Sequence, residues 1–139
     1  MRERLSKKEI AALFGEGLNC AQVVLGNWAD ELGYDPEEAH HMAAAFGGGM
    51  FRGDTCGAVS GALIAVGLAC ADDPQQLKEK TALFQEKFTQ RFGSTICRDL
   101  IGYDFSKPGQ LELAAAGGKL LDFCPEAVAA ALEILEEIL

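Results

Sequence analysis

Apolar residues recur at helical spacing along most of the chain, in segments separated by helix start and stop signals. Ser6 begins a capping box for a short helix that ends near Gly15. No stretch alternates apolar and polar residues long enough to predict a strand. The pattern predicts an all-α fold, a single compact domain over residues 1–139 built as a bundle of about six helices. The later helical segments, delimited by capping residues, prolines and glycines, are predicted at about residues 19–32, 35–47, 55–71, 73–92, 95–101 and 125–139.

Two segments depart from this amphipathic pattern. Residues 55–71 carry no charge and contain Gly57, Gly61 and Gly67. This run is short for a membrane span, so we expect a buried central helix. Residues 102–118 hold a proline and several glycines, and we expect mostly loop with one helical turn there.

Composition and charge exclude several function classes. Hydrophobic residues make up 49% of the 139 residues, enough for a packed core and against disorder. The formal net charge of −9 argues against nucleic acid and anionic membranes as partners. The charged N-terminus lacks the apolar segment of a signal peptide, so we expect a cytoplasmic protein, where structural disulfides are rare.

The cysteines carry the candidate chemistry. Cys20, Cys56 and Cys97 fall where helices are predicted to begin, and Cys124 directly precedes a proline, which favours the first helical position. A helix start offers unpaired N–H groups and a positive dipole, which lower a thiol's pKa and favour the reactive or metal-binding thiolate. Cys70 lies late in its helix, where the dipole opposes a thiolate, and is assigned to packing. No C-x-x-C is present, so neither a zinc ribbon nor a thioredoxin motif is indicated.

Cys56 is the strongest single candidate, because small residues follow it. Gly57 and Gly61 near a helix start cost roughly 1 kcal/mol each in helix propensity, which calls for a compensating reason. Small residues at this spacing allow another backbone or a cofactor to approach closely. Helix–helix packing alone is the alternative explanation.

The sequence does not decide the roles of three charged or titratable residues. Arg52 lies close before Cys56 and is either a neighbour of a thiolate or a solvated surface charge. His40 and His41 are adjacent in a predicted helix, so their side chains face different directions. We expect one of them to be exposed and the other packed.

Four cysteine-bearing segments stand out together: Asn19-Cys20-Ala21-Gln22, the run from Gly53 to Ala62 with Cys56-Gly57-Ala58-Val59-Ser60-Gly61 at its centre, Cys97-Arg98-Asp99-Leu100, and Cys124. They resemble the C-GCAxxG-C-C family of redox-active proteins. The resemblance covers nearly the whole chain, and all four cysteines match in order. It implies redox activity through Cys20, Cys56, Cys97 and Cys124.

Two mechanisms remain open for these cysteines. In thiol–disulfide exchange, Cys56 would attack as a low-pKa thiolate and Cys20 would resolve the intermediate. We expect Cys20 to neighbour Cys56, and Cys97 to neighbour Cys124. In the other mechanism, Cys20, Cys56, Cys97 and Cys124 would hold an iron–sulfur cluster or a zinc ion.

A different class, a non-catalytic helical binding or oligomerisation module with structural cysteines, also stays open. The sequence names neither a redox partner protein nor a small-molecule substrate. It leaves enzyme activity and homo-oligomerisation undecided.

Overall fold

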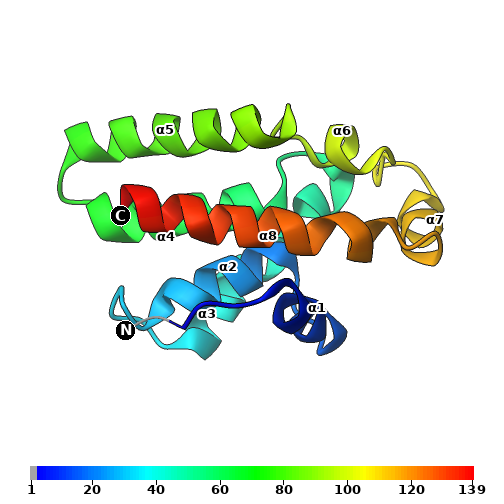
Figure 1. Ribbon diagram of the computed structural model, residues 1–139, viewed down its shortest axis with the longest axis horizontal. Helices are drawn as coiled ribbons and strands as arrows, with labels where there is room; N and C mark the ends of the chain where they lie inside the picture. Colours follow the sequence, from blue (N-terminus) through cyan, green and yellow to red (C-terminus); the bar gives the residue numbers. More distant parts are fainter. Residues whose placement is uncertain (1–2) are drawn as a thin grey trace.

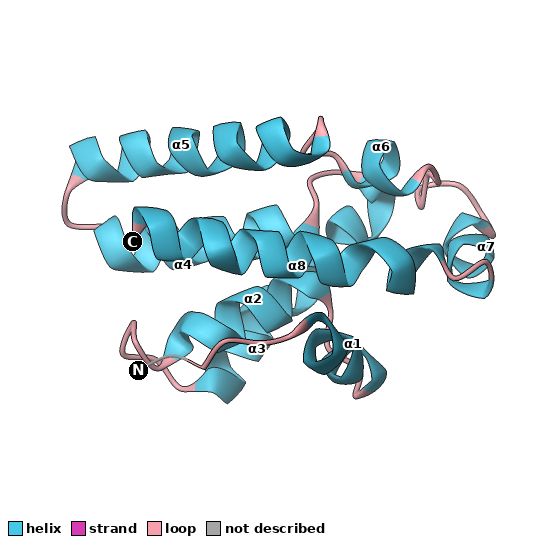
Figure 2. Cartoon of the chain, in the orientation of Figure 1, coloured by secondary structure: helices cyan, strands magenta, loops and turns pink. Residues whose placement is uncertain are grey.

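The computed structural model describes residues 3–139, and this part of the chain is helical with no strand (Figure 2). The all-α prediction is therefore confirmed, although the described residues form eight α-helices rather than about six. A 3₁₀ turn, η1 (Ala44–Phe46), and a π turn, η2 (Gly49–Gly53), join α3 to α4. The α-helices are α1 (Lys7–Gly15), α2 (Cys20–Ala29), α3 (Pro36–Ala43), α4 (Gly57–Cys70), α5 (Pro74–Phe92), α6 (Cys97–Ile101), α7 (Gln110–Ala116) and α8 (Lys119–Ile138).

The predicted caps set the helix starts. Ser6 and Glu9 form the expected capping box at α1, and Asn19 forms a second one with Gln22 at α2. The Asp73 side chain accepts the Gln76 N–H and caps α5. Each cap satisfies N–H groups that would otherwise lie unpaired at the helix start.

The uncharged helix α4 lies at the centre and packs against α2, α5 and α8 (Figure 1). Its side chains Val59, Ala62 and Val66 are fully buried in the main hydrophobic core. The prediction of a buried central helix is thus confirmed. Over residues 3–139, none of the helices combines the length and apolar character that a membrane crossing requires.

Glycine lets α2 and α4 approach at backbone distance. A Cβ added at Gly61 would lie 2.7 Å from the Ala21 carbonyl oxygen and 2.8 Å from the Ala21 Cα. Because both atoms belong to the backbone of α2, no side chain could move aside. The small residues of α4 therefore serve close helix packing, and this packing sets the position of Cys20 next to Ala21.

A row of aromatic rings joins α5 to the start of α8. The rings of Phe88 and Phe92 have centroids 4.8 Å apart, and Phe92 meets Phe123 edge-on at 5.4 Å. Phe123 also packs against a second, smaller core cluster that contains Cys97 and Ile101. The row thereby anchors the residues around Cys124 to the rest of the bundle.

The last helix begins earlier than predicted. The proline signal placed a helix start at Pro125, but α8 begins at Lys119, and Pro125 lies buried inside it. A proline in a helix interior costs about 3 kcal/mol. Burial of Leu120 and Phe123 against the second cluster offsets this cost and keeps the preceding turn helical. Cys124 is therefore in the second turn of α8 and not at a helix start.

Other boundaries also differ. The segment 102–118, predicted as mostly loop, contains α7, whose Ala114 is fully buried in the second cluster. The second helix ends at Ala29 rather than near residue 32, and α3 ends at Ala43. The Leu32 N–H still donates to the Trp28 carbonyl at 3.2 Å, so helical bonding continues close to the predicted end of the second helix.

Candidate functional site

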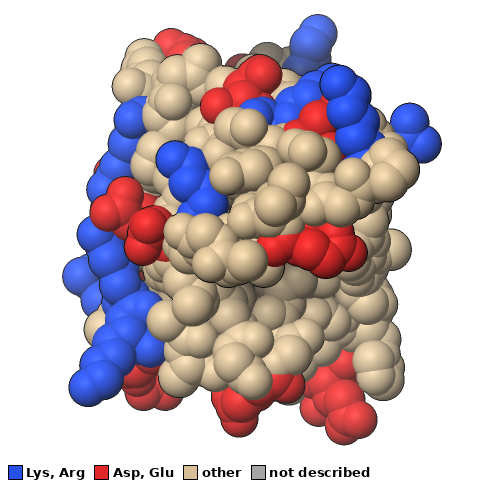
Figure 3. Space-filling view, turned by 90° about the vertical axis from the view of Figure 1, so that its right-hand side faces the viewer, with Lys and Arg blue, Asp and Glu red and all other residues tan. Residues whose placement is uncertain are grey.

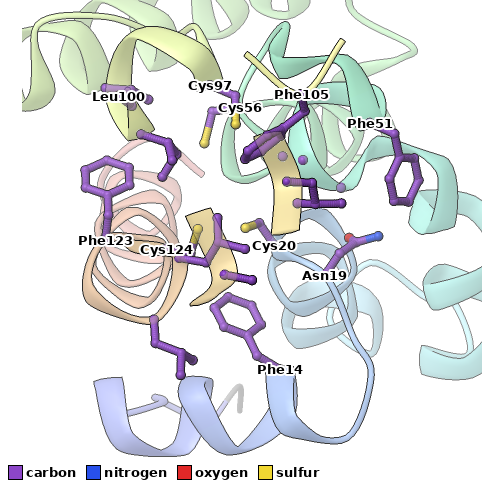
Figure 4. A pocket seen from close by; sticks show the side chains of 18 of the residues that line it. Phe14, Asn19, Cys20, Phe51, Cys56, Cys97, Leu100, Phe105, Phe123 and Cys124 are labelled. Atoms are coloured by element: carbon purple, nitrogen blue, oxygen red, sulfur yellow. The ribbon is translucent and has the colours of Figure 1, made fainter. Parts of the chain in front are cut away.

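A cavity of about 330 Å³ lies where α2, α4 and α6 begin and α7 and α8 meet. Cys20, Cys56, Cys97 and Cys124 all line it, and their sulfurs point toward it in Figure 4. Cys70 is buried but does not line the cavity, in agreement with its assignment to packing. The structure thus brings the four candidate cysteines, from four different helix regions, around one space.

Gly57 controls the distance between α2 and α4 at the cavity. Cys20 is the first residue of α2, and Cys56 is the N-cap residue of α4. A Cβ at Gly57 would lie 3.1 Å from the Cβ of Cys20 and 3.2 Å from the backbone nitrogen of Ala21. The glycine that follows Cys56 therefore makes room for Cys20, as the small-residue pattern predicted.

A short backbone bridge places Cys56 and Cys97 on the same side of two adjacent segments. The Cys56 N–H donates to the Thr95 carbonyl at 2.8 Å, and the Cys97 N–H donates to the Asp54 carbonyl at 2.6 Å. These two bonds flank an isolated antiparallel pair between Thr55 and Ile96. Thr55 and Ile96 lie opposite each other and point to one face of this pairing. Cys56 follows Thr55 and Cys97 follows Ile96, and successive residues of an extended segment point to opposite faces. Both cysteines therefore project to the other face.

The glycine-rich connection beside the cysteines has four successive residues in the left-handed backbone conformation. Gly48, Gly49, Met50 and Phe51 all have φ between 57° and 62°. A Cβ at Gly49 would lie 2.9 Å from the Cβ of Cys97, so the close approach requires glycine there. The turn presents Phe51 at the cavity rim, where it is 58% exposed.

Among the four cavity cysteines, Cys20 and Cys124 interact most strongly with each other. Hydrogen bonding between the two thiols raises the pKa of Cys20 and lowers that of Cys124. Burial and the neighbouring thiols raise the pKa of Cys20 further. Both residues are half-buried, whereas Cys56 and Cys97 are nearly inaccessible.

The expectation of a low-pKa Cys56 is wrong. Burial raises its pKa to about 11, although the N–H groups of Ala58 and Val59, at the helix start, act in the opposite direction. Burial likewise raises the pKa of Cys97 to about 12. The helix start therefore does act on Cys56, but loss of solvent outweighs it. Of the four cavity cysteines, Cys124 is the one whose pKa falls.

The cavity wall carries no charge. Within residues 3–139, none of the residues that line it is Asp, Glu, Lys, Arg or His. Asn19 is a polar residue in the wall, but its amide oxygen accepts the Gln22 N–H and its amide nitrogen donates to the Ala44 carbonyl. The other side chains are aliphatic or aromatic apart from the thiols.

Arg52, His40 and His41 do not line the cavity. Arg52 is largely exposed, lies 3.8 Å from an Asp54 carboxylate oxygen, and does not line the cavity. His40 is half-buried, and a Cβ at Gly26 of α2 would clash with its ring. His41 is exposed, so the expectation of one packed and one exposed histidine is confirmed.

The thiols do not form a preformed metal-ion site within residues 3–139. In the part of the chain that the structure describes, no three His, Cys, Asp or Glu side chains form a group that could ligate one. The five cysteines are free thiols in this structure. The predicted zinc site thus gains no support from the geometry, and the iron–sulfur cluster stays an untested prediction.

The apolar part of the site was missed in the sequence analysis. Leu111, Leu120 and Leu121 line the cavity from α7 and from the first turn of α8, both absent from the predicted helices. Phe14 closes the cavity from the end of α1. The signal was the recurrence of leucines and phenylalanine between residues 111 and 123, a density unusual for a surface loop.

These features define a helical protein with a cysteine-lined apolar cavity. A family model described as "Putative redox-active protein (C_GCAxxG_C_C)" matches residues 18–138, so the chain belongs to this family. No curated protein and no solved structure gives a significant match to the chain. The predicted family resemblance is confirmed. The four cysteines on which that resemblance was based lie around the cavity.

Proposed function

We propose that this protein performs two-electron thiol–disulfide exchange, with Cys20 and Cys124 as the reactive dithiol. The observation that carries the proposal is that four cysteines line one cavity and that Cys20 and Cys124, the two more accessible of them, interact through their thiols. Two such thiols can reach disulfide distance after modest movement of their side chains. Family membership supports redox activity in general.

The two residues take different roles in this reaction. Cys124 is the attacking sulfur, because the hydrogen bond from Cys20 favours its thiolate, the nucleophilic form. Cys20, which holds its proton, attacks second and resolves the mixed disulfide. Cys56 and Cys97 remain protonated at neutral pH because burial raises their pKa values. They line the other side of the cavity in Figure 4.

A redox titration with matched variants tests the proposal. Reduced protein is equilibrated in thiol buffers of known potential, its free thiols are alkylated, and its mass is measured. We expect one two-electron couple that is lost in Cys20→Ala and in Cys124→Ala. Cys70→Ala, which removes a buried cysteine away from the cavity, should keep that couple.

Two outcomes would overturn the proposal. One is a wild-type protein whose thiol count does not change across the titration. The other is stoichiometric iron with sulfide, or zinc, in protein purified without oxygen, together with loss of the metal in the cysteine variants. The metal content is therefore measured on the same samples, because a bound metal would also protect thiols from alkylation.

A further inference from the structure

The composition of the cavity wall indicates which disulfides can reach Cys124. Phe14, Leu100, Phe105 and Phe123 surround the sulfurs, and no charged side chain of residues 3–139 reaches the cavity. A carboxylate or an ammonium group that entered would lose its hydration and find no opposite charge. The amide of Asn19 could not replace that hydration, since its oxygen and nitrogen are bound to the backbone.

The entrance has the same character as the interior. Phe51 and Leu121 line the cavity and are 58% and 63% exposed, so the cavity opens to solvent through an apolar rim. Figure 3, which views the end of the bundle where α7 lies, shows mostly uncharged surface, with acidic and basic side chains next to one another in several places. The cavity volume of about 330 Å³ suits a small molecule.

We propose that the substrate is a small, uncharged, largely apolar disulfide that enters this cavity, and that charged disulfides are excluded from it. This inference rests on the thiol–disulfide exchange proposed above. It assigns the cavity as the binding site and names the class of molecule that the site accepts.

The exchange balances without any further reactant. The Cys124 sulfur attacks one sulfur of the substrate, the substrate S–S bond breaks, and a mixed disulfide forms while the first substrate thiol leaves. The Cys20 sulfur then attacks the Cys124 sulfur, which forms the Cys20–Cys124 disulfide and releases the second substrate thiol. Two electrons and the two thiol protons pass from the protein to the substrate.

A pair of aryl disulfides with different charge tests the inference. Dipyridyl disulfide is uncharged at neutral pH, and dithiobis-nitrobenzoate carries two carboxylates; both release a coloured thiol. For each reagent, the rate of formation of the Cys20–Cys124 disulfide is divided by the rate of its reaction with free mercaptoethanol. This division corrects for the different intrinsic reactivity of the two reagents. We expect this normalised rate to favour the uncharged reagent by about a hundredfold or more. The preference should persist at about 1 M salt, where long-range repulsion by the acidic protein is screened.

Two lysine substitutions distinguish the effect of the cavity from the effect of the overall charge on this preference. Leu121→Lys places a cation at the rim, and Leu113→Lys places one at a similarly exposed leucine that does not line the cavity. Both variants change the net charge equally. At low salt, we expect Leu121→Lys to reduce the preference about tenfold, because the cation can pair with an entering carboxylate. Leu113→Lys should leave the preference within about twofold.

Each outcome is decisive. If both reagents close the pair equally fast, the assigned substrate class is wrong while the exchange reaction stands. If the preference vanishes at high salt, or both lysine variants reduce it equally, overall charge and not the cavity explains it. If neither reagent closes the pair, the proposed function itself fails.

Discussion

Replacement of Gly61 by alanine should destabilise the protein by forcing α2 and α4 apart. The new Cβ would lie 2.7 Å from the Ala21 carbonyl oxygen and 2.8 Å from its Cα, well inside contact distance. Overpacking of this kind costs about 1–3 kcal/mol. The alanine recovers up to about 1 kcal/mol, because glycine is a poor helix former. The expected net effect is therefore a loss of up to about 2 kcal/mol.

Gly67→Ala is the matched control for this prediction. Gly67 lies in the same helix, α4, but a Cβ there meets nothing within 4 Å. This variant should gain the helix propensity without the clash and become more stable by up to about 1 kcal/mol. The difference between the two variants then isolates the contact between the helices, at about 1–3 kcal/mol.

Urea unfolding followed by far-UV circular dichroism measures this difference. In a chain of this size, each 1 kcal/mol also moves the midpoint of thermal unfolding by about 3 °C. A Gly61→Ala variant as stable as Gly67→Ala would refute the close packing of α2 on α4. It would also remove the argument for how Cys20 is positioned.

Two further predictions concern pH and backbone strain. The folded state holds the Cys56 proton up to a pKa of about 11, whereas an unfolded thiol releases it near 8.5, so stability should fall as pH rises between these values. Urea unfolding at several pH values gives the free energy of unfolding as a function of pH. In Cys56→Ala, the fall of this free energy with pH should be smaller by up to about 1.4 kcal/mol per pH unit, and an unchanged fall would contradict the prediction. Met50 has a φ of 61°, so Met50→Gly should stabilise the protein by up to about 1 kcal/mol. Met42→Gly, at a similarly exposed methionine inside α3, should instead destabilise it, and equal effects would argue against strain at Met50.

The sequence was sufficient to predict features that depend on local chemistry. Ser6, Asn19 and Asp73 act as caps because their side chains bond to N–H groups only three residues away. The central position of α4 followed from its lack of charge. The close approach allowed by Gly57 and Gly61 followed from the absence of side chains at those positions.

The predictions from the sequence that were wrong depend on contacts between distant segments. Pro125 looked like a helix start, but burial of Leu120 and Phe123 extends α8 in front of it. The dipole argument for Cys56 considered its own helix only, and could not include the burial that raises its pKa. The hydrogen bond between Cys20 and Cys124 joins residues at opposite ends of the chain, which no local pattern encodes.

The central claim is that Cys20 and Cys124 form the reactive pair, and disulfide mapping tests it most directly. Metal-free, reduced protein is oxidised with one equivalent of dipyridyl disulfide, its remaining thiols are blocked, and its peptides are identified by mass spectrometry. We expect a single crosslink between Cys20 and Cys124, with Cys56, Cys70 and Cys97 recovered as blocked thiols. A crosslink of Cys20 to Cys56, or of Cys97 to Cys124, would contradict the account.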